Sequence, residues 1–162
     1  MRKTIDNILE KALIVLMGLM VINVTWQVLS RYLARWGVIA QASTATEELA
    51  RFLLIWLGLL GAAYASGKGQ HLAIDLLPQS LQGKKKDRLS RLINGFVCLF
   101  SLLVMMIGGG RLVYLTFALE QSSAALGLPL GVVYMVLPIS GLLILYYSLA
   151  DFLSPLTTQT NP

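Results

Sequence analysis

The chain has 162 residues, of which 56% are hydrophobic and only 13% are charged, and its mean hydropathy is +0.71. Soluble domains carry about a quarter charged residues, so this composition excludes an ordinary soluble domain and indicates a membrane protein. The formal net charge of +5 could indicate nucleic-acid binding, but the bases are not interleaved with exposed aromatics, and basic loops of a membrane protein explain the same excess. The single cysteine, Cys98, allows no intrachain disulfide and no cysteine metal cluster.

Four stretches without a formal charge give the expected topology. They cover residues 12–30, 52–67, 92–110 and 121–150. A helix needs about 20 mostly apolar residues to cross a bilayer, so each stretch can supply one transmembrane helix. The predicted helices cover residues 9–31, 46–66, 90–117 and 130–152. The expected fold is therefore an all-α integral membrane protein with four transmembrane helices, and residues 1–162 are expected to form a single membrane domain.

The first apolar stretch, which follows Arg2 and Lys3, loosely fits a signal peptide. It continues, however, into "NVTWQVLSRYLARW" with no small-x-small cleavage site at its end. The pattern therefore favours a first helix that is retained in the protein.

The basic residues orient the four helices. If the spans alternate, nine bases lie on the side of the two termini and four on the opposite side. The nine are Arg2, Lys3, Lys11, Lys68, Lys84, Lys85, Lys86, Arg88 and Arg91, and the four are Arg31, Arg35, Arg51 and Arg111. Cytoplasmic loops of membrane proteins carry the excess of Lys and Arg, so both termini are expected in the cytoplasm.

The second predicted helix begins with an unusual group of charges. Thr44 and Glu47 have the spacing of a capping box, in which the glutamate reaches back to a free backbone N–H. Arg51 lies one turn after Glu47 and is placed for an i,i+4 ion pair. Glu48 lies about 100° around the helix and has no evident partner nearby in the sequence.

Small and polar residues form stripes along the predicted helices. On the second helix Gly58 and Ala62, four residues apart, form a small-xxx-small pair that permits close helix approach. The other helices carry stripes with Asn23, Ser101 and Gly141 as representative members. Because lipid provides no hydrophobic drive for helix association, such stripes indicate contact between helices, either within this chain or with a second polypeptide.

The sequence offers little catalytic or ion-coupling chemistry. Charged residues deep in a span usually mark ion relays and coupled transport, and here none lies deep in a predicted span. A stand-alone exporter would normally need such a carboxylate. A haem-binding anchor subunit of a redox enzyme would be expected to offer paired histidines, but His71 is the only histidine. We therefore expect no enzyme activity, no cofactor and no metal site in this chain.

Residues 45–77 carry a family resemblance. The segment "EELARFLLIWLGLLGAAYASGKGQHLAIDLL" resembles the signature of the small membrane subunit of tripartite ATP-independent periplasmic (TRAP) transporters, the DctQ-type permeases. The later segment "LGLPLGVVYMVLPISG" is similar to the last part of that family. One departure is Gly67, at a position where a second basic residue is expected beside Lys68.

The resemblance implies a role in a larger transporter. In this family a large permease subunit moves the substrate with a sodium gradient, and a periplasmic binding protein delivers an organic acid such as a C4-dicarboxylate or a sialic acid. The small subunit would brace the large one and could help to dock the binding protein. A base on either partner is then a candidate contact for Glu48, the alternative being a helix-cap charge in the headgroup region.

The connection between the second and third helices is expected to contain a short interfacial segment at residues 72–81, interrupted at Pro78, in which leucines stand among polar neighbours. His71 and Asp75 either pin this segment to the large subunit or pair with each other locally. The residues expected at a subunit interface are Glu47, Glu48, Arg51, Gly58, Ala62, His71 and Asp75. Membrane lipids are the other expected partner, and nucleic acid is not.

Overall fold

The computed structural model describes residues 2–38, 43–68 and 84–153. These residues form helices, and four of the helical stretches are long and apolar enough to cross a membrane. Their bounds are Arg2–Arg35, Thr44–Gly67, Leu92–Ala118 and Leu130–Ala150, and an 18-residue segment within each has a mean hydropathy of 2.1, 1.6, 2.2 and 2.0, respectively. The prediction of an all-α membrane protein with four spans is confirmed. The predicted interfacial segment at 72–81 lies outside the described residues.

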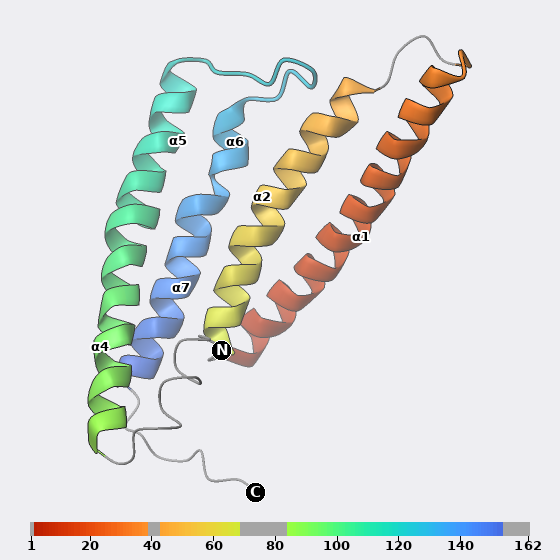
Figure 1. Cartoon of the computed structure of the whole chain (residues 1–162). Coiled ribbons are helices and arrows are strands. Elements are labelled where there is room, and N and C mark those ends of the chain that lie inside the picture. Colours follow the sequence, from red (N-terminus) through yellow and green to blue (C-terminus); the bar gives the residue numbers. More distant parts are fainter. Residues whose placement is uncertain (1, 39–42, 69–83, 154–162) are drawn as a thin grey trace, which may run out of the picture.

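The helices lie side by side in an order that differs from their order in the chain (Figure 1). Helix α1 (Arg2–Arg35) packs on α2 (Thr44–Gly67), and α2 packs on α7 (Val136–Leu153). The other face of α7 receives the third span, which consists of α4 (Lys84–Phe100), a π-helical stretch η1 (Ser101–Gly108) and α5 (Gly109–Ala118). The short helix α6 (Leu130–Tyr134) precedes α7. Helix α1 is thus an edge helix, and α2 and α7 form the centre.

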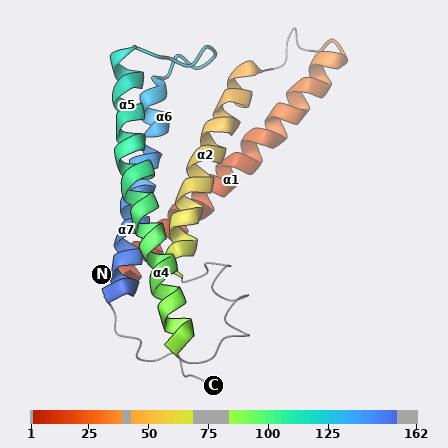
Figure 2. The same cartoon turned by 60° about the vertical axis from the view of Figure 1, so that its left-hand side comes forward.

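The helices lie closer together at one end of the bundle than at the other. The start of α1, the end of α2, the start of α4 and the end of α7 lie at the end that carries the N-terminus. At the other end α1 and α2 lean away from α5 and α6, as both views show (Figures 1 and 2). We call these the inner end and the outer end, respectively.

Helix α1 is longer than the predicted span at 9–31. It begins at Arg2 and ends at Arg35, because a helix satisfies its own backbone hydrogen bonds and can continue beyond the hydrocarbon layer on polar residues. Its first turns have contacts of their own, since Arg2 and Asp6 reach α2 and α7. Hydropathy alone could not show this extension.

The third and fourth spans are irregular where they pack on each other. The helix of the fourth span is interrupted at Met135, four residues after Gly131 and three before Pro138. Proline has no N–H to donate and its ring displaces the carbonyl four residues earlier, so it accounts for the break. In the third span the π-helical stretch ends at Gly108, and a Cβ on Gly109 would lie only 3.0 Å from Cβ of Leu137. The glycine therefore permits close approach of the two spans.

The interior of the bundle combines apolar side chains with small polar ones. Its buried residues include Ala63, Ser101, Ser140 and Ser148. The Ser101 hydroxyl donates to the carbonyl of Gly141 at 2.6 Å, and the Ser148 hydroxyl donates to that of Asn94 at 3.2 Å. Many large apolar side chains lie on the outside, as expected for a protein surrounded by lipid.

Several predicted stripes therefore serve internal packing. Asn23 donates its side-chain N–H to the carbonyl of Thr46 at 2.8 Å and so joins α1 to α2. A Cβ on Gly141 would lie 2.8 Å from Cβ of Met105, and one on Gly131 would meet the ring of Phe117. These small residues are thus already used for contact within the chain.

Candidate functional site

The two neighbouring glutamates at the start of α2 face different partners. Glu47 binds Arg51 at 2.9 Å and Arg31 at 3.2 Å, so it joins α2 to the end of α1. The three side chains remain 41–69% exposed. Exposed ion pairs contribute little to stability, so this group fixes the direction of the side chains more than it stabilises the fold. The predicted pair of Glu47 with Arg51 is confirmed.

The predicted capping box is wrong. Ser43 is the N-cap residue of α2, and no side-chain cap hydrogen bond forms there. The Thr46 hydroxyl donates instead to the carbonyl of Ser43 at 2.8 Å. Because the carboxylate of Glu47 is taken up by two guanidinium groups, it does not turn back toward the backbone of the N-cap.

Glu48 has partners within the chain, although the sequence shows none nearby. One carboxylate oxygen, Oε2, accepts the hydroxyl of Ser123 and the backbone N–H groups of Ala125 at 3.0 Å and Leu126 at 3.3 Å. These residues belong to the loop between α5 and α6, which reaches toward the start of α2 at the outer end (Figure 1). The Glu48 carboxylate therefore has no hydrogen-bond partner nearby in the sequence among the described residues, as expected, and its partners within the chain are more than 70 residues away.

The loop that holds Glu48 is built from its own backbone hydrogen bonds. Ser122 and Pro129 form an antiparallel bridge, and the N–H of Ser123 donates to the carbonyl of Leu128 at 2.9 Å. Gly127 has a φ of 63°, in the left-handed region where glycine is favoured. The loop therefore presents a defined surface at the outer end.

Gly58 and Ala62 lie on a face of α2 that no other described part of the chain covers. A Cβ on Gly58 would meet nothing within 4 Å, and both residues are exposed. On the opposite side of α2, Trp56 donates its indole N–H to the carbonyl of Val133 at 3.1 Å. The small-xxx-small pair thus does not mediate packing within the described chain. We call Gly58 and Ala62 the open face of α2.

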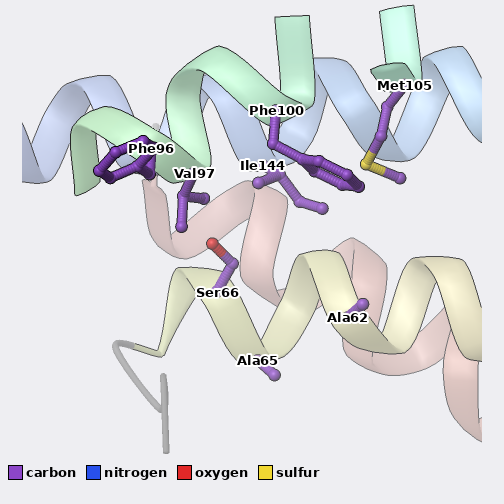
Figure 3. A pocket seen from close by; sticks show the side chains of 8 residues that line it. All are labelled: Ala62, Ala65, Ser66, Phe96, Val97, Phe100, Met105 and Ile144. Atoms are coloured by element: carbon purple, nitrogen blue, oxygen red, sulfur yellow. The ribbon is translucent and has the colours of Figure 1, made fainter. Parts of the chain in front are cut away.

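An apolar groove of about 500 Å³ borders this open face. Figure 3 shows that α2 forms one wall and that the third span and α7 form the other. The lining residues are Ala62, Ala65, Ser66, Phe96, Val97, Phe100, Met105 and Ile144. Ala62 belongs to both the groove and the open face, so the two surfaces are continuous.

At the inner end a buried tyrosine joins three helices, and sequence reasoning missed it. Tyr147 of α7 is fully buried and donates its hydroxyl to Asp6 of α1 at 2.5 Å. Its ring lies against Gly67, the last residue of α2, where a Cβ would be 2.7 Å from ring atom Cζ. The Arg2 guanidinium donates to the Gly67 carbonyl at 2.6 Å. A side chain in place of Gly67 would therefore have to displace the Tyr147 ring.

His71 and Asp75 lie outside the described residues. Glu47, Glu48 and Arg51 gather at the outer end of α2, whereas Gly58 and Ala62 lie farther along it. The five predicted interface residues that the structure describes thus form two separate groups on one helix.

Comparison with known proteins decides the family. Residues 20–158 match the family described as "Tripartite ATP-independent periplasmic transporters, DctQ component". The chain belongs to the DctQ family. Members of this family work with a large permease subunit, and the chain is a multi-pass inner-membrane protein.

Three relatives illustrate the range of the family. The chain is 29% identical to a sialic acid TRAP transporter small permease protein, SiaQ, of Vibrio cholerae, with 84% of this chain and 79% of the relative covered. It is 29% identical to the C4-dicarboxylate small permease protein DctQ of Rhodobacter capsulatus, with 62% and 44% covered. It is 30% identical to the isethionate permease protein DctMQ of Oleidesulfovibrio alaskensis, with 72% of this chain but only 18% of the relative covered.

Proposed function

We propose that this DctQ-family chain is the small subunit of a sodium-driven transporter that takes up an organic acid delivered by a periplasmic binding protein. The relatives' names support the substrate class, because sialic acid, C4-dicarboxylates and isethionate are all organic anions. Sodium coupling and substrate binding are assigned to the large subunit. No charged side chain lies deep in the predicted spans of this chain, as ion coupling would usually require.

The open face of α2 is the observation that carries the scaffold role. A small-xxx-small pair lets another helix approach closely, and within the described chain Gly58 has no neighbour on that side. The adjoining groove offers apolar walls for the larger side chains of the approaching helix. We therefore assign the open face to a transmembrane helix of the large subunit. His71 and Asp75 are proposed to pin the following segment to the same subunit.

The outer end is the proposed docking surface for the binding protein. The charged group of Glu47, Arg31 and Arg51 is exposed there, beside the loop that Glu48 holds. Exposed charges steer a soluble partner and are readily screened by salt. Weaker docking at high salt is therefore expected.

This assignment of the two ends requires cytoplasmic termini, for which the charge bias of nine bases against four is the support. Single cysteines at Thr4 and Gln121, introduced after Cys98→Ser, test it because both native residues are exposed near opposite ends. In intact spheroplasts an impermeant reagent should label the Gln121 cysteine and spare the Thr4 cysteine. Labelling with the opposite preference would invert the orientation.

Transport in proteoliposomes tests the function itself. Labelled sialic acid, a C4-dicarboxylate and isethionate are supplied with a sodium gradient and the cognate binding protein. Uptake should require both membrane subunits. Uptake by this chain alone would refute the scaffold role, and full uptake by the large subunit alone would show that this chain is dispensable.

A further inference from the structure

The loop between α5 and α6 carries the donor set of a carboxylate site. The Ser123 hydroxyl and the consecutive N–H groups of Ala125 and Leu126 converge on one oxygen of Glu48. Successive backbone N–H groups that point to one place form a nest, a concavity that binds anions. Hydrogen bonds to a charged acceptor are stronger than those between neutral groups. The chemistry of the loop therefore selects a carboxylate.

The loop supports this donor set with bonds that do not involve Glu48. The N–H of Gly127 donates to the carbonyl of Ser123 at 2.9 Å, and the N–H of Leu130 donates to that of Gln121 at 2.9 Å. Ser123 is buried, with 5% of its surface exposed. Since these bonds lie within the loop, the donors should stay close together when the Glu48 side chain is removed.

The hydrogen bonds between Glu48 and the loop connect two halves of the bundle. Helices α1 and α2 lean away from α5 and α6 at the outer end (Figure 2). The hydrogen bonds of Glu48 to the loop join these two halves there. Glu47, the preceding residue, instead pairs with Arg31 of α1 and Arg51 of α2, within the half formed by these two helices. Glu48 is thus the glutamate that fixes the loop relative to α2.

We propose that residues 123–126 form a carboxylate-binding site, that Glu48 is its built-in occupant, and that this occupant positions the loop for the docking of the binding protein. The third element rests on the proposed function, which supplies the partner. A group in the same chain has a high effective concentration at its site. Free carboxylates at ordinary concentrations therefore do not displace Glu48.

Removal of the occupant tests the site directly. In the purified complex with the large subunit, Glu48→Ala should speed hydrogen–deuterium exchange of a peptide covering residues 123–128 about tenfold, because the charge-assisted bonds are lost. Acetate should slow the exchange again, whereas chloride at equal ionic strength should not. Unchanged exchange in this variant, or exchange that acetate does not slow, would overturn the site.

Matched variants separate this effect from general loosening of the fold. Glu47→Ala removes the adjacent carboxylate and should leave the exchange of residues 123–128 unchanged and insensitive to acetate. If Glu48→Ala does not fold, Glu48→Gln keeps the side-chain volume and one acceptor oxygen. The exchange rate of residues 123–128 should increase less in Glu48→Gln than in Glu48→Ala, and acetate should not change it, because the glutamine amide occupies the site. If acetate slows exchange in Glu48→Gln as much as expected for Glu48→Ala, the proposal is contradicted.

Uptake measurements test the positioning role. The concentration of binding protein that gives half-maximal uptake should rise severalfold in Glu48→Ala and stay raised in acetate, which can fill the site but is not attached to α2, while the maximal rate stays unchanged. A lower maximal uptake rate with an unchanged half-saturating concentration of binding protein would refute the role of Glu48 in positioning the loop. If the natural complex shows no uptake that depends on a binding protein, the proposed function fails, and the exchange experiment still decides the carboxylate site.

Discussion

Two glycines of α2 have opposite surroundings, although they lie only nine residues apart. A Cβ on Gly67 would overlap the ring of Tyr147 at 2.7 Å, whereas one on Gly58 would meet nothing within 4 Å. Gly67 is buried and Gly58 is exposed. Gly67 is therefore required by a contact inside the chain, and Gly58 leaves room for something outside it.

The difference shows that small residues in a membrane helix have no single meaning. Without a hydrophobic drive between helices, close van der Waals packing is a main source of association both within a subunit and between subunits. The same residue type therefore suits both uses. Substitutions at the two glycines should consequently separate folding from assembly.

The largest expected effect is that of Gly67→Leu. The larger side chain must displace Tyr147 and the contacts of its ring with Arg2, and overpacking of this kind costs about 1–3 kcal/mol or more. The thermal midpoint of the purified subunit in detergent should fall sharply. Gly18→Leu is the matched control, because a Cβ there meets nothing within 4 Å. Equal midpoints for the two variants would show that the Gly67 contact is unimportant.

Gly58→Leu should affect assembly and leave folding intact. The isolated subunit should keep its thermal midpoint, whereas the amount of large subunit that co-purifies with it should fall severalfold. Gly18→Leu and Gly110→Leu add the same bulk at other open positions and should preserve co-purification. Loss of assembly in all three glycine variants would mean that the open face of α2 is not a specific contact.

Trp56→Phe should have a moderate effect on the packed side of α2. It removes the hydrogen bond from the indole N–H to the Val133 carbonyl but keeps an aromatic ring. Hydrogen bonds between helices in membrane proteins contribute about 0.6 kcal/mol on average. The thermal midpoint should fall slightly and co-purification should be unchanged. A loss of assembly would place the partner on this side of α2.

The smallest expected difference in thermal midpoint is between two variants that each lose one hydroxyl group. Ser101→Ala removes a buried bond to Gly141 of the neighbouring helix and should cost about 0.6 kcal/mol. Thr25→Ala removes an exposed bond to the carbonyl of Val21 in its own helix and should change the midpoint even less. A larger fall of the thermal midpoint for Thr25→Ala than for Ser101→Ala would contradict the interior described for this bundle.

Much of the architecture was predictable because the requirements of a bilayer act on single segments. Each span must be long and apolar, so charge-free stretches located four helices to within a few residues at most ends. The exceptions have local reasons. Helix α1 begins at Arg2 and α4 begins at Lys84, both ahead of the predicted starts at 9 and 90, because each helix continues on polar residues. Pro138 interrupts the last span at Met135. The pair of Glu47 with Arg51 was predictable because i,i+4 spacing brings two side chains together on any helix.

The sequence by itself determined the number of spans, the family and the local ion pair, whereas tertiary structure decided which partner each conspicuous residue has. Glu48 meets Ser123, and Gly67 meets Tyr147, across 75 and 80 positions of the chain, and no periodicity encodes such pairs. Tertiary structure also decided which stripes of small residues pack against other helices of the same chain. In water a polar face marks the outside of a helix, but in a bilayer lipid and protein are both apolar surroundings. Only the positions of the neighbouring helices therefore distinguish the packed side of α2 from its open face.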